Sequence, residues 1–207
     1  MFNLSTNIFD NLPGRAIQYK MAPNDRKDLL KTYSVDKNTR KSATLLLVYK
    51  KNNDYYSVLI KRSEYNGHHS GQISFPGGKF EISKDANLQD TAIRETFEEI
   101  GVKINKKNIA GKLTPLFIPL SNIMVYPFVA FINHDLSFTA DKTEVKKIIE
   151  YKLSTLLNPK TRKTETIKKD NKKITTPYFL ISNEKVWGAT AMILNEFIYL
   201  TRKIRDL

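Results

Sequence analysis

The residues TAIRETFEEIGV, from Thr91 to Val102, constrain the fold of this chain more than any other stretch. When they are plotted at about 100° per residue, their glutamates fall within one narrow sector of a helix. An apolar side lies opposite and is made of Ile93, Phe97 and Ile100. Gly101 follows, and glycine often ends an α-helix. The pattern predicts a helix over Leu88–Ile100 with an apolar face for the core and a carboxylate face for another purpose.

Two of these glutamates, Glu95 and Glu99, are i, i+4 neighbours, and like charges at that spacing repel each other on a bare helix. A divalent cation would reverse this effect, and Mg²⁺ is typically held by one or two carboxylates together with substrate phosphates and water. The alternative is a solvated acidic face, which is common on exposed helices. The glycine-rich residues GQISFPGGKF just before the helix favour the metal interpretation, because glycine lets the backbone approach a metal or phosphate closely.

Composition excludes several other kinds of site. The chain has 207 residues with no cysteine and 3 histidines, so disulfides, thiolate zinc sites and cysteine nucleophiles are excluded and a histidine-rich metal site is not expected. Its 34 Lys and Arg outnumber 21 Asp and Glu, and the resulting net charge of +13 favours anionic partners. A genomic lysine bias and solubility are the alternative explanation. The longest apolar run, Ala43–Tyr49, is too short to span a membrane and the first residues lack a signal-peptide pattern, so we expect a cytoplasmic location.

Runs rich in β-branched and aromatic residues predict strands along most of the chain. The expected strands lie in Ser42–Lys50, Tyr55–Ser63, Ile109–Leu120 and Ile123–Ile132. The polar residues KKNND between the first two runs predict a hairpin turn. A second hairpin is expected in Thr164–Ile181, around the turn KKDNKK, which we interpret as a solvated tip.

Two further segments have helical character. Thr143–Leu157 is expected to be rich in helix, and Trp187–Leu207 has helical periodicity with basic residues in its last turns, which suits the helix dipole. We expect Trp187 to pack at the start of that last helix and Gly188 to permit close approach to it.

Because strands and helices are mixed, the fold class is α/β or α+β with a mixed sheet. Residues 1–40 are polar and punctuated by LPG and MAPNDR, and we expect an N-terminal arm or short helix packed on the domain. Neither a linker nor a repeat interrupts the remainder, so residues 41–207 are expected to form a single domain.

The residues PGGKFEISKDANLQDTAIRETFEEIGV resemble the Nudix box, and its Arg-Glu-X-X-Glu-Glu-X-Gly ending is complete here from Arg94 to Gly101. LIKRSEYNGHHSGQISFPGGK, before the box, and VWGATAMIL, near the C-terminus, are similar to segments of the coenzyme A pyrophosphatase subfamily. The resemblance covers roughly residues 40–200 and implies an α/β/α sandwich with a mixed sheet and a single Nudix domain.

The resemblance also implies roles for the glutamates. Glu95 and Glu99 would be the main ligands of Mg²⁺ or Mn²⁺, and Glu98 would be a further ligand or the base for the attacking water. The backbone carbonyl of Gly77 would be an additional ligand. Arg94 would orient the carboxylates by bidentate hydrogen bonding, which lysine does poorly. Glu144 stands where the family often supplies a loop carboxylate, as base or ligand, and its alternative is a surface glutamate at the start of a helix.

The expected substrate contacts are Arg62, His69, Gly78 and Lys79, with loop buttressing as the alternative for His69. The sequence departs from the family pattern in this region. Fifteen residues separate Gly78 from Arg94, which makes this loop longer than the usual one. The family pattern has a glutamate midway along the loop, and the nearest acidic residue here is Asp85. Gly67 occupies a position where a basic residue is often found.

The resemblance implies metal-dependent hydrolysis of a pyrophosphate linkage, with coenzyme A or acyl-CoA giving 3′,5′-ADP and 4′-phosphopantetheine or its acyl form. The alternatives are another Nudix activity on nucleoside diphosphate derivatives or capped RNA, and a non-catalytic domain that binds nucleotides or RNA. The expected partner is a small anionic molecule. Nucleic acid and membranes are not expected as partners, and a homodimer is left open.

Overall fold

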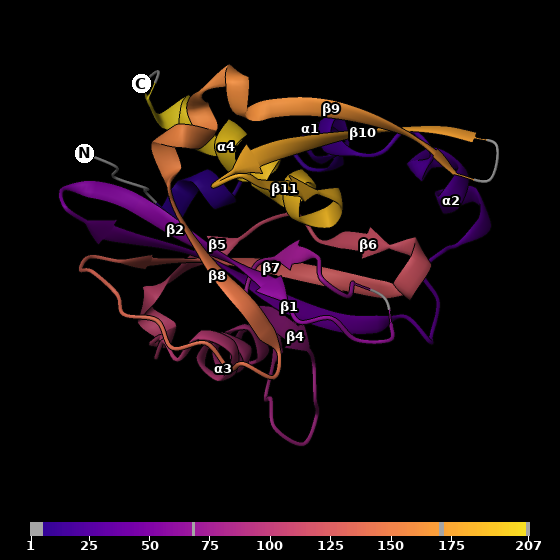
Figure 1. The fold of residues 1–207 in the computed structure, drawn as a ribbon. Helices are drawn as coiled ribbons and strands as arrows, with labels where there is room; N and C mark the ends of the chain where they lie inside the picture. Colours follow the sequence, from indigo (N-terminus) through magenta and orange to yellow (C-terminus); the bar gives the residue numbers. More distant parts are fainter. Residues whose placement is uncertain (1–5, 68, 170–171, 206–207) are drawn as a thin grey trace.

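The central layer of this computed structural model is a mixed β-sheet with helical elements on both of its faces (Figure 1). The structure describes residues 6–67, 69–169 and 172–205. The main path of the sheet is β3-β2-β1-β7-β5, with β4 paired to β1, β6 to β7 and β8 to β2. The neighbours β1 and β7 run parallel and the other pairs are antiparallel. Its strands are β1 (Arg40–Lys51), β2 (Asp54–Arg62), β3 (Ile73–Ser74), β4 (Gly77–Lys79), β5 (Ile109–Lys112), β6 (Leu116–Ile118), β7 (Ile123–Ile132) and β8 (Val145–Lys152).

A second, three-stranded antiparallel sheet lies with α4 on one side of the central sheet, and α3 covers the other side (Figure 1). Its strands are β9 (Arg162–Lys169), β10 (Lys172–Ile181) and β11 (Glu184–Trp187). The helices are α1 (Arg15–Gln18), α2 (Arg26–Thr32), α3 (Leu88–Ile100) and α4 (Gly188–Arg205). This arrangement confirms the α/β/α sandwich with a mixed sheet.

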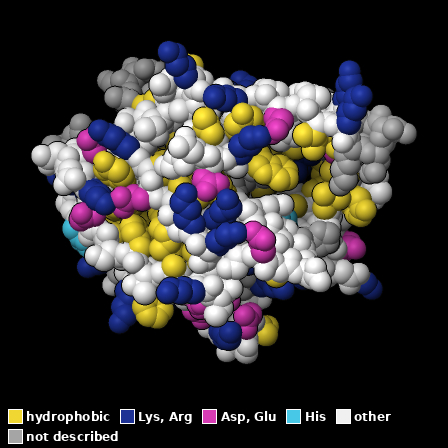
Figure 2. All heavy atoms as spheres, viewed as in Figure 1, with side chains coloured by type: hydrophobic (Ala, Val, Ile, Leu, Met, Phe, Trp, Pro, Cys, Tyr) yellow, Lys and Arg dark blue, Asp and Glu magenta, His cyan; other side chains and the backbone are white. Residues whose placement is uncertain are grey.

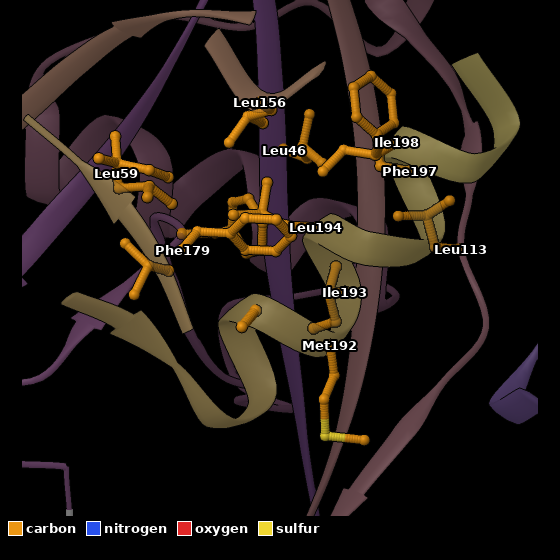
Figure 3. Packing of buried hydrophobic residues seen from close by; sticks show 14 of the residues in the cluster. Leu46, Leu59, Leu113, Leu156, Phe179, Met192, Ile193, Leu194, Phe197 and Ile198 are labelled. Atoms are coloured by element: carbon orange, nitrogen blue, oxygen red, sulfur yellow. The ribbon is translucent and has the colours of Figure 1, made fainter. Parts of the chain in front are cut away.

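The apolar run of β1 divides the core into two clusters, because successive side chains of a strand point to opposite faces. Leu46 and Val48 belong to the cluster under α4, and Leu45 and Leu47 belong to the cluster under α3. Figure 3 shows the first cluster, in which Leu46 from the sheet and side chains of α4 gather around Phe179. Burial on both faces explains why this strand is a continuous apolar run.

Both predicted hairpins are confirmed. β1 and β2 are joined through Asn52 and Asn53, whose φ angles of 48° and 61° suit a tight hairpin turn. β9 and β10 form the second hairpin, and residues 170–171 at its tip lie outside the described residues.

The predicted helix over Leu88–Ile100 is confirmed with both of its ends. The side chain of Asn87 accepts hydrogen bonds from the first-turn amides, and Gly101 ends the helix in the left-handed conformation. Its apolar face is confirmed in part, because Ile100 is fully buried and Ile93 packs against the cluster under α3. Phe97, however, is 45% exposed, whereas Ala92, Thr96 and Glu99 are buried. The small side chains of Ala92 and Thr96 face inward, and this orientation of the helix carries Glu99 inward with them.

The prediction of a helix-rich segment over Thr143–Leu157 is wrong. Val145–Lys152 is strand β8, which pairs with β2, and a short 3₁₀ helix, Leu153–Leu157, follows it. Burial along β8 partly alternates, with Val145, Ile149 and Tyr151 buried. The edge of β2 offers unpaired backbone groups, and pairing with them satisfies this segment's own backbone.

The expectations for Trp187 and Gly188 are also wrong. Trp187 ends β11 and remains 45% exposed rather than packed. A Cβ atom added to Gly188 would meet nothing within 4 Å, so this glycine does not serve close packing. Its φ of +61° explains the glycine instead, because other residues rarely adopt that conformation.

The N-terminal segment contributes to the core under α4, where Met21 is fully buried and Ile8 and Leu12 pack against it. The division of the chain at residue 40 stays a prediction. Among the described residues, no helix combines the length and apolar character that crossing a bilayer requires.

Candidate active site

The carboxylate of Glu99 is the buried centre of the candidate site. The residue is 1% exposed and faces β4, where the backbone N–H of Gly77 donates to its Oε2 at 2.8 Å. Arg62, at the end of β2, donates from Nη1 to Oε1 at 3.3 Å. Burial raises the pKa of Glu99 from 4.5 to about 8, because removing the carboxylate from water disfavours its charged form.

Glu95 lies one turn earlier and rests against Gly78. A Cβ atom at Gly78 would lie 2.3 Å from the Oε2 of Glu95, so only glycine leaves room for this carboxylate. Burial raises the pKa of Glu95, Arg94 opposes that rise, and the charges of Glu98 and Glu144 add to it. The glycine pair and α3 therefore form a cradle for two carboxylates.

Arg94 connects the carboxylates around the cradle. Its Nη1 donates to Glu95 and Glu98, each at 2.8 Å, and its Nη2 donates to the backbone carbonyl of Lys79 at 3.2 Å. Its remaining bonds go to Asp85, and these partners raise the pKa of the guanidinium. A lysine could not make so many directed bonds at once.

Asp85 is the residue whose role the sequence left open. It is 4% exposed and accepts hydrogen bonds from Arg94, from the hydroxyl of Thr91 at 2.9 Å and from the backbone N–H of Glu81 at 3.0 Å. The Arg94 hydrogen bonds hold the pKa of Asp85 at about 2. Asp85 thus fixes Arg94 from the loop before α3, and it stays on the opposite side of Arg94 from the cradle.

The other two acidic candidates differ in position. The side chain of Glu98 is 49% exposed and is directed to Arg94. Glu144 lies in the turn before β8 rather than at the start of a helix, and its backbone carbonyl accepts from the N–H of Ser63 at 2.8 Å. Its charge adds to the raised pKa values of both Glu95 and Glu99, so Glu144 lies on their side of the molecule.

The predicted substrate contacts are not equivalent. His69 has both ring nitrogens engaged within the protein, with Gln72 at 3.0 Å and Ser121 at 3.1 Å, which favours loop buttressing. The side chain of Lys79 is exposed beside the cradle. Arg62 reaches the buried carboxylate directly.

The cradle fits a hard divalent cation. Glu95 and Glu99 could hold one together with the carbonyl of Gly77, all through oxygen, which Mg²⁺ and Mn²⁺ prefer. Within the described ranges, no three His, Asp or Glu side chains converge on one such position. An ion held by two carboxylates would keep coordination positions for phosphate and water.

Comparison with known proteins agrees with this geometry. The model of the NUDIX domain matches residues 39–169. The mitochondrial coenzyme A diphosphatase NUDT8 of Homo sapiens is 31% identical over 137 residues, which are 65% of this chain and 57% of that protein's length. The uncharacterized Nudix hydrolase NudL of Photorhabdus laumondii is 30% identical over 159 residues, which are 77% of this chain and 83% of that protein.

Two solved structures share the fold at low sequence identity. A MutT/nudix family protein from Enterococcus faecalis superposes with a TM-score of 0.52 at 16% identity, covering 100% of this chain and 75% of its own. A MutT protein from Methanosarcina mazei Go1 gives a TM-score of 0.54 at 18% identity, covering 83% of this chain and 99% of its own. The glutamate helix, the glycine cradle, the sandwich and the domain match lead to one conclusion: this chain belongs to the Nudix family.

Proposed function

We propose that this chain hydrolyses the pyrophosphate linkage of coenzyme A or acyl-CoA and releases 3′,5′-ADP and 4′-phosphopantetheine or its acyl derivative. The observation that carries the reaction class is the buried Glu99 carboxylate against the amide of Gly77, next to a second carboxylate. Arg62 and Arg94 contact these two carboxylates, yet burial still raises the pKa of both, and a bound divalent cation would favour their charged forms. The choice of coenzyme A rests on the 31% identity to a coenzyme A diphosphatase.

In this proposal Glu95 and Glu99, with the carbonyl of Gly77, hold Mg²⁺ or Mn²⁺. A bound divalent ion neutralises charge that develops on the phosphoryl oxygens and lowers the pKa of water. Arg94 holds the Glu95 carboxylate in place through its 2.8 Å hydrogen bond, while Asp85 holds Arg94.

The attacking water needs a base, and Glu144 is our first candidate because its charge contributes to the raised pKa of both Glu95 and Glu99. Glu98 is the second candidate, but its carboxylate is bound to Arg94 at 2.8 Å. The base takes a proton from the water while the water oxygen bonds to one phosphorus. The bond from that phosphorus to the bridging oxygen breaks, and the other phosphate leaves with its substituent.

The substrate is strongly anionic, and Lys and Arg side chains are spread over the face of the molecule that Figure 2 shows. Arg62 and Lys79 would contact phosphate oxygens, and the backbone of Gly78 would contact the diphosphate next to Glu95. His69 would hold the loop in place. The net charge of +13 would favour encounter with any such anion. A cytoplasmic location stays a prediction from the sequence, and the oligomeric state stays open.

A substrate panel tests the proposal. The purified 207-residue chain is incubated with coenzyme A, acyl-CoA, ADP-ribose, NADH, a dinucleoside polyphosphate and capped RNA, each with Mg²⁺ and with Mn²⁺. We expect fastest turnover of the coenzyme A compounds. Turnover of the other compounds without turnover of the coenzyme A compounds would reject coenzyme A as the substrate. No turnover of any compound would favour a non-catalytic binding domain.

Matched variants separate chemistry from folding in the same assay. Glu99→Gln removes the carboxylate that would bind the ion and should abolish turnover while the protein stays folded. Glu165→Gln, on β9 with a side chain that is 44% exposed, removes a surface glutamate and should leave turnover unchanged. Equal activity of the two variants would remove Glu99 from the reaction.

A further inference from the structure

A half-exposed aromatic ring lies beside the candidate active site. Tyr65, in the loop after β2, is 45% exposed. The guanidinium carbon of Arg62 lies 5.9 Å from the centre of its ring, and the same guanidinium donates to Glu99 at 3.3 Å. One arginine side chain therefore connects the buried carboxylate with a half-exposed aromatic residue.

Gly67 makes room for this ring. A Cβ atom at Gly67 would lie 2.9 Å from Cε2 of Tyr65, which is closer than real Cβ contacts come, and 3.2 Å from Cδ2, which is a tight contact. The backbone of the loop is tied as well, because the N–H of Tyr65 donates to the hydroxyl of Ser70 at 2.9 Å. Gly67 thus allows an aromatic ring to lie against the loop, at a position where the family pattern often has a basic residue.

From this arrangement we infer that Tyr65 is a specificity-determining residue that stacks the adenine base of the substrate. The inference rests on the proposed function. A tyrosine ring carries no charge to offer a phosphate, whereas its face stacks well on a nucleobase. The adenine is the flat aromatic part of coenzyme A, and the pantetheine arm is a flexible chain with no such face.

Arg62 and Tyr65 would contact different parts of the substrate. Arg62 can pair with a phosphate oxygen through its fork of N–H donors. Its contact with the Tyr65 ring is a cation–π contact, which keeps the ring beside the charged part of the site. A nucleotide with its phosphates at the cradle could therefore place its base, which is linked through one ribose, on Tyr65.

The test measures binding rather than turnover. Isothermal titration calorimetry on the full chain compares three probes, 3′,5′-ADP, 5′-ADP and 4′-phosphopantetheine, in the wild type and in variants. Tyr65→Leu should weaken both adenine nucleotides by about tenfold, the typical loss when an aromatic stacking partner is removed. Binding of 4′-phosphopantetheine should not change, because this probe has no base.

Three further variants sharpen the result. Tyr65→Phe keeps the ring and should bind like the wild type. Gly67→Ala should weaken the adenine nucleotides without unfolding, because its Cβ meets only the outer ring atoms of Tyr65. Tyr33→Leu removes another tyrosine that is 44% exposed and should have no effect.

The outcomes separate this inference from the proposed function. Undiminished nucleotide binding by Tyr65→Leu, or an equal loss for 4′-phosphopantetheine, would overturn the stacking role even if the enzyme hydrolyses coenzyme A. A wild type that binds no adenine nucleotide would overturn it too. A tenfold loss specific to the adenine nucleotides would support it even if the substrate panel rejected coenzyme A.

Discussion

Arg94 binds both carboxylate oxygens of Asp85, with its Nε 2.8 Å from Oδ1 and its Nη2 2.9 Å from Oδ2. This two-point contact fixes the plane of the guanidinium, so that the remaining nitrogen, Nη1, points at Glu95. The loop before α3 therefore determines where a carboxylate of the cradle is held, although Asp85 itself never reaches the cradle.

We predict that Asp85→Asn destabilises the protein by about 2 kcal/mol at neutral pH, the free energy that corresponds to lowering its pKa from 3.8 to about 2. Because the pKa is lowered on folding, this stability is present above about pH 4 and disappears as the pH falls towards 2. Urea unfolding of wild type and variant from pH 7 to pH 2 measures the difference, which should shrink across that window. A difference that stays constant down to pH 2 would contradict the assignment.

The variant Arg94→Lys tests the geometry of the same pair. Lysine keeps the charge but cannot make two parallel bonds to Asp85 while also holding Glu95. We expect kcat to fall by at least tenfold, with a smaller fall for Asp85→Asn, since Arg94 there still reaches Glu95. Steady-state kinetics at saturating Mg²⁺ distinguish the two. An Arg94→Lys enzyme with wild-type kcat would show that charge alone suffices.

The buried Glu99 predicts an unusual dependence of stability on pH. Its pKa is raised from 4.5 to about 8 on folding, so the native state holds a proton that the unfolded chain has lost. The metal-free protein should therefore lose stability as the pH rises from about 4.5 to about 8. If Glu99 holds the proposed ion, Mg²⁺ displaces that proton, and its stabilising effect should grow over the same range.

Thermal unfolding between pH 5 and pH 9, in EDTA and in Mg²⁺, measures both slopes. Glu99→Gln should flatten the EDTA curve and remove most of the response to Mg²⁺. The surface variant Glu165→Gln is the control and should reproduce the wild type. A Mg²⁺ response that is independent of pH, or one that survives in Glu99→Gln, would place the ion elsewhere.

Helix α3 shows how far the sequence predicts this site. The limits of the helix are predicted by periodicity and by Gly101, and the roles expected of its glutamates come from the family pattern. The rotation of the helix is not predicted, because periodicity favours the bulky apolar side chains for the core. The structure instead turns Phe97 outward and buries Glu99, since burial here depends on packing against β1 and β4. Functional sites are where such local rules are expected to fail.

Contacts between different segments of the chain are equally hard to predict from the sequence. Asp85 forms its bonds to Arg94 across a loop whose length differs from the family pattern, and spacing alone does not say which acid closes it. Strand β8 carries a pattern that also suits a helix, and only its pairing with β2 decides between the two. Short apolar runs remain ambiguous until their partners are known.

The two glycines of the cradle should respond differently to alanine. A Cβ at Gly77 would lie 2.4 Å from the backbone oxygen of Ala43, and its φ of +150° disfavours any side chain, so Gly77→Ala should cost more than about 2 kcal/mol of stability. The three atoms nearest to a Cβ at Gly78 all belong to the carboxylate end of the Glu95 side chain, which can turn away more easily than backbone can. Gly78→Ala should therefore stay folded yet bind Mn²⁺ at least tenfold more weakly. Urea unfolding and Mn²⁺ titration should separate them, and equal destabilisation would refute the difference.

Glu196 is a fully buried residue on α4 that no sequence motif marks. It accepts hydrogen bonds from the backbone N–H of Gly14 at 3.2 Å and from the side chain of Gln18 at 2.8 Å, and Thr114 donates twice more. Glu196→Gln turns an NH₂ group towards these donors, so we expect a loss of about 2–4 kcal/mol in urea unfolding. Activity per folded molecule should not change, because Glu196 makes none of its bonds within the cradle. A variant that stays stable but loses activity would instead connect the N-terminal segment to the site.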